Sequence, residues 1–144
     1  MSTLRDLYLT VCKKERVTPN SIVQKMLPAD SAEYPEDELD LSQNYLGDRG
    51  FAAFCDILPE LRIHKLSVRH NGLRNKAVVK LCDVLKEHET IEAIDLSDNF
   101  ISTGAGVAIV ELLRANKVIK AVILEHTKID AKMRVTIENL LKGR

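Results

Sequence analysis

The chain has 144 residues, which is enough for one domain with a substantial buried core. Its 21 Lys and Arg residues balance its 21 Asp and Glu residues, and its aromatic residues are three Tyr and three Phe, with no Trp. This composition argues against a general nucleic-acid binder, because such proteins need a basic surface and aromatic platforms on which bases stack.

No apolar run is long enough to suggest a transmembrane helix, and the first ten residues, MSTLRDLYLT, lack the basic-then-apolar order of a signal peptide. The three cysteines are an odd number, and no N-x-S/T sequon is present. Both features favour a reducing compartment. We therefore expect a cytoplasmic protein, with association with the cytoskeleton as a refinement, and no contact with a membrane.

The N-terminal region carries two short helical patterns. Its apolar residues recur at helical spacing, first from Leu4 to Val11 and then, after the turn signal TPNS, from Ile22 to Leu27. A polar loop with two prolines follows at Pro28–Glu36. We interpret residues 1–35 as a helical cap and loop in front of the next region.

The rest of the chain is built from a segment that occurs four times. Its copies are ELDLSQNYL (Glu38–Leu46), KLSVRHNGL (Lys65–Leu73), AIDLSDNFI (Ala93–Ile101) and AVILEHTKI (Ala121–Ile129). One position is shared by Asn44, Asn71, Asn99 and Thr127, at spacings of 27, 28 and 28 residues. Such a period is typical of a solenoid, in which each repeat packs mainly against its neighbours.

Within each copy the apolar pattern changes its period from two to about 3.6. The first copy alternates at Leu39 and Leu41 and continues at helical spacing from Phe51 to Leu58. This pattern predicts a strand, a turn and a helix in every repeat, with parallel strands because a helix connects each strand to the next. We place the repeats at 36–62, 63–90, 91–118 and 119–144, within a single domain over 1–144.

The four registered copies of L-x-L-x-x-N-x-L resemble the leucine-rich repeat family. Their period resembles its ribonuclease-inhibitor-like subclass, which includes the repeat domain of tropomodulin and the Ran GTPase-activating proteins. The resemblance covers about Pro35 to Leu141. It implies an α/β fold, a short horseshoe-shaped solenoid with a parallel sheet on its concave face and helices on the outside.

The two ends of the repeat region carry patterns typical of caps. In the last copy Arg134 and Glu138 occupy the helix positions that hold Phe51 and Cys55 in the first copy. We therefore expect the outer flank of the last repeat to face water, and the two caps together predict a self-contained solenoid.

The repeated asparagine is expected where each strand ends and the chain turns. An amide directed inward there both donates and accepts hydrogen bonds, and so satisfies turn backbone groups that would otherwise be buried unpaired. We interpret Asn44, Asn71 and Asn99 as a structural ladder, in which Thr127 performs part of the same role.

The residues between the inward leucines are predicted to line the concave face, on strands about 4.8 Å apart. We predict that a partner protein binds there and that Ser97 faces outward with the binding residues. The candidate partner-binding residues are Asp40, Lys65, Ser67, Arg69, His70, Asp95, Asp98, Ile123, Glu125 and His126.

One predicted column places Asp98 between His70 and His126. Histidine and aspartate are common metal ligands, and histidine also relays protons. However, a flat row on an open surface provides neither a closed ligand shell nor a nucleophile. The remaining interpretations are a polar row that contacts a partner or a plain solvated surface, and we predict no metal, no cofactor and no catalytic residue.

A second feature of this face is its apolar C-terminal half, formed by Ala93, Ala121 and Ile123. An exposed β-branched side chain near an open sheet edge is a candidate anchor for a partner. The alternatives are that C-terminal residues shield the last strand or that the patch is too small to bind.

Three further motifs have structural interpretations. The small residues of TGAG (Thr103–Gly106) suit the tight start of a helix better than a phosphate loop, because no GK[ST] follows. Cys55 and Cys82 share one repeat position, which favours core packing over nucleophilic chemistry. We expect the basic tail KGR to be solvated, with contact to an acidic surface as the alternative.

These patterns predict a non-catalytic scaffold that binds a protein partner through its concave face or its C-terminal edge. A first alternative, which the resemblance to tropomodulin implies, is a structural component of a cytoskeletal or axonemal assembly that self-associates as a homo-oligomer through the C-terminal edge. A second, which the resemblance to the Ran GTPase-activating proteins implies, is a GTPase-regulating module, in which Arg69 or Arg49 supplies a charge in trans.

Overall fold

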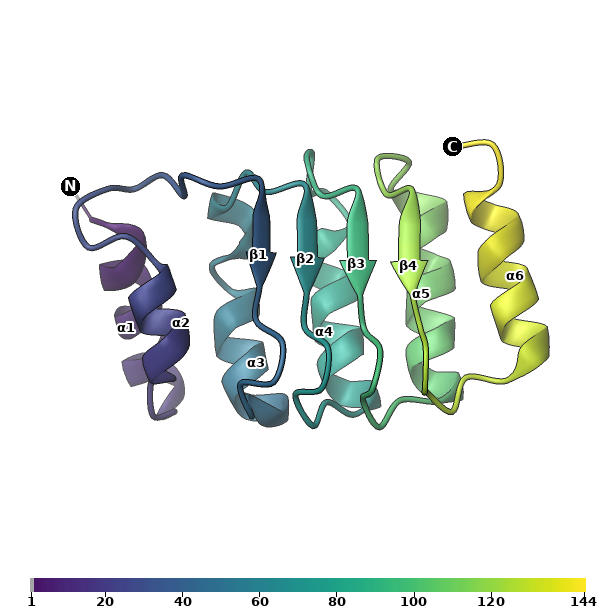
Figure 1. The fold of residues 1–144 in the computed structure, drawn as a ribbon, viewed down its shortest axis with the longest axis horizontal. Coiled ribbons are helices and arrows are strands. Elements are labelled where there is room, and N and C mark those ends of the chain that lie inside the picture. Colours follow the sequence, from purple (N-terminus) through teal and green to yellow (C-terminus); the bar gives the residue numbers. More distant parts are fainter. Residues whose placement is uncertain (1) are drawn as a thin grey trace.

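The computed structural model describes residues 2–144 and confirms the α/β solenoid (Figure 1). One parallel sheet has the order β1-β2-β3-β4, and the helices form a second layer behind it. The strands are β1 (Glu38–Asp40), β2 (Lys65–Ser67), β3 (Ala93–Asp95) and β4 (Ala121–Ile123). The repeat helices are α3 (Gly47–Cys55), α4 (Asn75–Leu85), α5 (Thr103–Ala115) and α6 (Ala131–Leu141), and the cap helices are α1 (Leu4–Glu15) and α2 (Ser21–Met26).

The strand register follows the repeat alignment. Leu39 is paired with Leu66, Leu66 with Ile94, and Ile94 with Val122, so the inward side chains form one continuous row. The core lies between this row and the helices, because each strand has one apolar face and each helix one apolar stripe. Buried helix residues that complete the core include Phe51, Phe54, Val78, Leu81, Ile109, Leu113 and Ile137.

The N-terminal cap is fixed by side-chain hydrogen bonds at its helix ends. Thr3 and Asp6 form a capping box at the start of α1, and Asn20 caps α2 by accepting from two backbone N–H groups. The Asn20 N–H donates to the hydroxyl of buried Tyr8, and the Asn20 amide donates to the carbonyl of Asn44. These bonds attach the cap to the first repeat.

The first repeat departs from the expected single helix. Helix α3 ends at Cys55, and Leu58–Glu60 forms a separate 3-10 helix, η1. Pro59 explains the break, because proline has no N–H to donate and its ring clashes with the preceding turn of an α-helix. Leu58 remains fully buried, so the apolar position is kept although the helix is not continuous.

The TGAG segment forms the first turn of α5. A Cβ atom on Gly106 would lie 2.6 Å from Cγ of Met133, which is on the neighbouring helix α6. This close approach between helices explains why a glycine occupies the position.

Candidate functional site

The polar residues of interest lie at the carboxyl ends of the strands, on the sheet face that the helices do not cover. At this end of every repeat one shared position has left-handed backbone, with φ between 54° and 57° at Gln43, His70, Asp98 and His126. Each of these residues directly precedes the repeated Asn or Thr position. The chain therefore turns out of the sheet one residue before that position.

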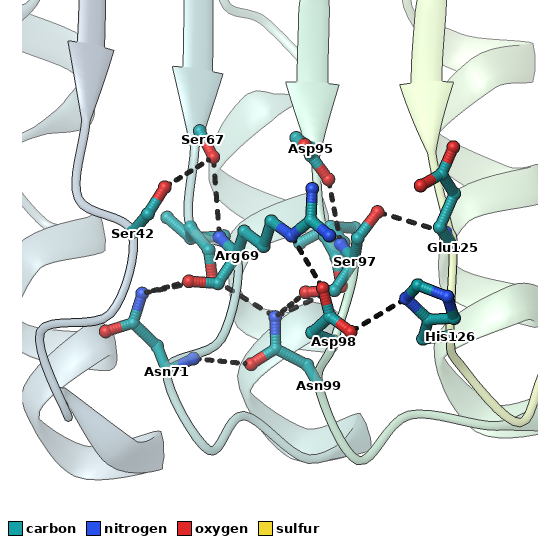
Figure 2. Close-up of polar contacts among 12 residues, drawn as sticks. Ser42, Ser67, Arg69, Asn71, Asp95, Ser97, Asp98, Asn99, Glu125 and His126 are labelled. Atoms are coloured by element: carbon teal, nitrogen blue, oxygen red, sulfur yellow. Dashed lines mark hydrogen bonds and ion pairs between the residues drawn. The ribbon is translucent and has the colours of Figure 1, made fainter.

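The asparagines at the turn point inward (Figure 2). The Asn99 Oδ1 atom accepts from the backbone N–H groups of Asn71 and Leu73, both at 3.0 Å. Its amide nitrogen donates to three carbonyls, those of Val68, Leu96 and Ser97. Each such asparagine therefore joins the turn of its own repeat to the turn of the preceding one.

Asn71 makes the same bonds one repeat earlier, since its Oδ1 accepts from the N–H groups of Asn44 and Leu46. Asn44 itself is half-buried, and the hydrogen bonds of residues 2–144 include none from its side chain. The ladder geometry thus holds for Asn71 and Asn99, while Asn44 takes part through its backbone.

The predicted row His70–Asp98–His126 is different in the structure. His126 Nδ1 lies 2.9 Å from Asp98 Oδ1, but the other carboxylate oxygen binds Arg69 Nε at 2.6 Å rather than His70 (Figure 2). His70 is exposed. Arg69 therefore takes the place beside the carboxylate that was predicted for His70, although His70 has the same left-handed backbone as Asp98 and His126.

This arrangement keeps Asp98 ionised. Burial alone would raise the pKa of its carboxyl, but the hydrogen bond and charge of Arg69, and then those of His126, lower that pKa below its ordinary value. The hydrogen bond to Asp98 correspondingly raises the pKa of the Arg69 guanidinium. Asp98 is therefore an anion held between two cationic or hydrogen-bonding groups from the neighbouring repeats.

Ser97 does not face outward, which corrects the sequence prediction. Its side chain is fully buried, and its Oγ accepts from the backbone N–H of Glu125 at 3.0 Å. Asp95 Oδ1 in turn accepts from the Ser97 N–H. The Ser97 hydroxyl accepts from a backbone N–H of the next repeat. This bond explains why the side chain is buried although the strand alternation predicted an exposed one.

Five of the remaining candidates line an open groove on the sheet face, whereas Glu125 is exposed and does not line it. The groove has a volume of about 190 Å³ and is lined by residues of all four strands, including Asp40, Lys65, Ser67, Asp95 and Ile123. Lys65 is paired with Glu38 at 3.3 Å. Ile123 is 42% exposed, so the C-terminal residues do not shield it.

The last repeat completes its turn differently. The Thr127 hydroxyl donates only to the Leu124 carbonyl. Arg134, which was expected to face water, folds back and donates to the carbonyls of Leu124 and Ile129 and to the Thr127 hydroxyl. Its guanidinium supplies donors that the asparagine amide supplies in the earlier repeats.

A second ladder, at the other end of the helices, was missed in the sequence. His88 Nε2 contacts the carbonyls of Leu58 and Leu61, and Asn116 donates to the carbonyls of Leu85 and His88. Arg144 contacts the equivalent carbonyls of Leu113 and Asn116, so the KGR tail is not simply solvated. The 28-residue spacing of His88, Asn116 and Arg144 was the available signal.

His88 is held as a neutral ring. It is 6% exposed, and its Nδ1 accepts from the N–H groups of Thr90 and Ile91, so Nε2 carries the proton. Burial lowers the pKa of this imidazole. Burial likewise raises the pKa of the Cys82 thiol to about 12 and raises that of Cys55, which agrees with core packing rather than nucleophilic chemistry.

Residues 2–144 can also be compared with the requirements of a metal site and of a membrane-spanning helix. No group of three or more His, Cys, Asp or Glu side chains in this part of the chain is arranged to hold a metal ion. No helix within the same residues has the length and apolar character needed to cross a membrane.

Solved structures with this arrangement identify the fold. The structure "Leiomodin-1 Actin-Binding Site 2 (ABS2)" superposes with a TM-score of 0.62 over 98% of this chain and 89% of that one, at 13% identity. The tropomodulin C-terminal domain of Caenorhabditis elegans gives a TM-score of 0.53 over 75% of this chain and 83% of its own, at 10% identity. The chain has a leucine-rich-repeat fold.

Sequence comparison places part of this leucine-rich-repeat chain close to larger proteins. Over 64 residues it is 38% identical to "NACHT, LRR and PYD domains-containing protein 3" of Homo sapiens and Mus musculus. The match covers 43% of this chain and 6% of either relative, so the chain spans only a small fraction of their length. No family model matches the chain.

Proposed function

We propose that this protein is a non-catalytic scaffold that binds a partner protein through its concave face and the adjoining edge of β4. The observation that carries the proposal is the exposed side chain of Ile123 on the edge strand, beside a groove formed by all four strands. An apolar anchor within a polar rim is the usual composition of a binding surface between proteins.

The charges of the face define the partner further. Lys65 and Arg69 are already paired with carboxylates of the face, Glu38 and Asp98. By contrast, the ion pairs of residues 2–144 include none for Asp40, Asp95 or Glu125. A complementary partner would present basic side chains around an apolar residue that packs on Ile123.

The test compares two variants as baits in the native cell extract. Ile123→Asp adds a charge at the proposed anchor, whereas Val79→Asp adds the same charge to helix α4, at a residue that is 50% exposed. We expect quantitative mass spectrometry to find partners that are lost with Ile123→Asp and retained with Val79→Asp. Identical sets of captured proteins with both variants would refute the concave face as the binding surface.

Actin is a specific candidate for the partner. Leiomodin-1 actin-binding site 2 has this fold over nearly the whole of the present chain, which supports a cytoskeletal role. Co-sedimentation of the purified protein with filamentous actin, and gel filtration with monomeric actin, test the idea directly. Absence of binding in both assays removes actin while leaving the scaffold proposal open to the bait experiment.

The two alternatives from the sequence have separate tests. Self-association through the C-terminal edge predicts a sedimentation coefficient that rises with protein concentration, and a concentration-independent monomer contradicts it. For a GTPase regulator, Arg69 is already bound to Asp98 and Arg49 donates to carbonyls at the end of α1. Stimulated GTP hydrolysis by a panel of small GTPases would restore that alternative.

A further inference from the structure

Two of the chain's few aromatic side chains are almost fully exposed on one rim of the solenoid. Tyr45 is 87% exposed and Phe100 is 73% exposed. Tyr45 lies in the loop from β1 to α3 and Phe100 in the loop from β3 to α5, each directly after the repeated asparagine. Gly72 occupies the same position in the loop between them, from β2 to α4. Figure 1 shows these three loops side by side along one edge.

The backbone at Tyr45 is strained. Its φ is 51°, in the left-handed region, while Gly72 takes the equivalent conformation with φ of 68° at no steric cost. A bulky residue is rare in this region, and at 87% exposure Tyr45 gains little packing that would offset the strain. Strained residues without a structural benefit are often functional, so the exposed ring itself has to be explained.

The spacing of the two loop positions that carry the rings matches a particular kind of ligand. Tyr45 and Phe100 are two repeats apart, which corresponds to about 9.6 Å at the usual strand spacing of about 4.8 Å. A polyproline II helix rises about 3.1 Å per residue with three residues per turn, so residues three apart share one face and lie about 9.3 Å apart. Aromatic side chains on a surface are the usual contacts for such a helix.

The positive charge of Arg74, between the two aromatic loops, favours an acidic ligand of this kind. Arg74 is exposed, its N–H donates to Asp48, and its backbone forms an isolated parallel bridge with Phe100. It therefore lies between the loops of the first and third repeats. The ion pairs of residues 2–144 do not include Arg74, so a carboxylate in the ligand would meet an available cation.

We propose that the rim formed by Tyr45, Gly72, Arg74 and Phe100 binds an extended, acidic, proline-rich segment of a partner protein. Prolines three residues apart pack on the rings of Tyr45 and Phe100, the chain between them passes over Gly72, and an intervening carboxylate binds Arg74. This rim is distinct from the concave face with Ile123, so the two surfaces can be tested independently.

The probe is a synthetic peptide with proline at every third position and glutamate between the prolines. Titration into the labelled protein should shift the amide signals of Tyr45, Gly72 and Phe100 and leave that of Ile123 unchanged. A peptide of the same composition with irregular proline spacing should bind at least about ten-fold more weakly, because only one ring is then occupied at a time.

Variants confirm or overturn the assignment. The double variant Tyr45→Asn, Phe100→Ser and the single variant Arg74→Glu should each weaken binding about ten-fold or more, whereas Val79→Ser should not change it. Asparagine tolerates the left-handed backbone, and circular dichroism verifies that each variant is folded. The proposal is wrong if no binding occurs up to about 1 mM, if both peptides bind equally, or if the shifts follow the concave face. Preference for an acidic amphipathic helix would also overturn it.

Discussion

The interior repeats and the last repeat use different side chains to bond the buried backbone groups of the turn. In the interior, the short amide of Asn99 lies inside the turn and bonds to two repeats at once. In the last repeat Thr127 reaches one carbonyl, and Arg134 from α6 supplies further donors. The comparison shows that the turn backbone sets the requirement, which Asn99 meets alone and Thr127 meets together with Arg134.

The same difference between side chains occurs at the other end of the helices. His88 and Asn116 bond the carbonyls at the end of the preceding helix from within interior repeats. Arg144 bonds the equivalent carbonyls from beyond the end of α6. A long cationic side chain can reach such carbonyls from beyond a helix end while it keeps part of its charge in contact with water.

The largest expected effect is at the interior turn. Asn99→Ala removes a buried side chain with five hydrogen bonds to backbone groups and should lower the free energy of unfolding by about 3–5 kcal/mol. The matched control is Asn44→Ala, at the same repeat position but without such bonds, which should cost less than about 1 kcal/mol. Urea denaturation measures both, and equal losses would contradict the difference between the two positions.

The next effect is at the last repeat. Arg134→Ala removes hydrogen bonds to Leu124, Ile129 and Thr127 from a half-buried guanidinium and should cost about 1–2 kcal/mol, because water reaches part of the site. Lys132→Ala, an exposed position on the same helix, should change stability by less than about 0.5 kcal/mol. Thermal denaturation measures both variants. An unchanged melting temperature for Arg134→Ala would show that the turn does not need these donors.

A pH-dependent effect should distinguish His88 from Asn116 in the second ladder. The pKa of His88 is lowered from 6.5 by burial, so the unfolded chain binds this proton more readily than the folded one. The contribution of the neutral His88 ring to the free energy of unfolding is therefore complete above about pH 6.5 and is lost as the pH falls below that value. His88→Asn, which copies the next repeat, should flatten the stability profile between about pH 7 and pH 5, and an unchanged profile would exclude His88 as the titrating group.

The smallest effect compares the rim positions of the first two repeats. Tyr45→Gly gives the first repeat the residue that the second has at Gly72, and it relieves the left-handed strain. The entropy of glycine in the unfolded chain offsets part of this gain, so we expect a net stabilisation of about 0.5 kcal/mol. Differential scanning calorimetry measures both variants. Phe100→Gly should instead lower the stability of the protein, because φ at Phe100 is not in the left-handed region.

Much of the fold could be predicted because it follows from short-range rules. The alternation around Leu39 and Leu66 fixes which side chains face the helices, and the repeat spacing fixes which strand residues are paired. The departures have local causes that are visible only with hindsight, such as Pro59 ending α3 early. The partner-binding role of the concave residues remains a prediction.

The polar site was less predictable because its side chains have several partners within reach. Asp98 was expected to lie between two histidines, yet Arg69 occupies one side of its carboxylate. Ser97 was expected on the surface, yet its hydroxyl binds the next repeat. Strand alternation describes where a Cβ points, but it does not predict that a hydroxyl on that face is buried by a bond to the backbone of the next repeat.

By itself, the sequence determined the number of repeats, their register and the inward direction of the leucines, because periodic apolar residues can be buried in only one way when identical units stack. Only the tertiary structure decided which long or polar side chains meet. Arg69 binds a carboxylate that the next repeat brings beside it, and Arg134 folds back to carbonyls of the turn before its own helix. Neither contact follows from a spacing in the sequence.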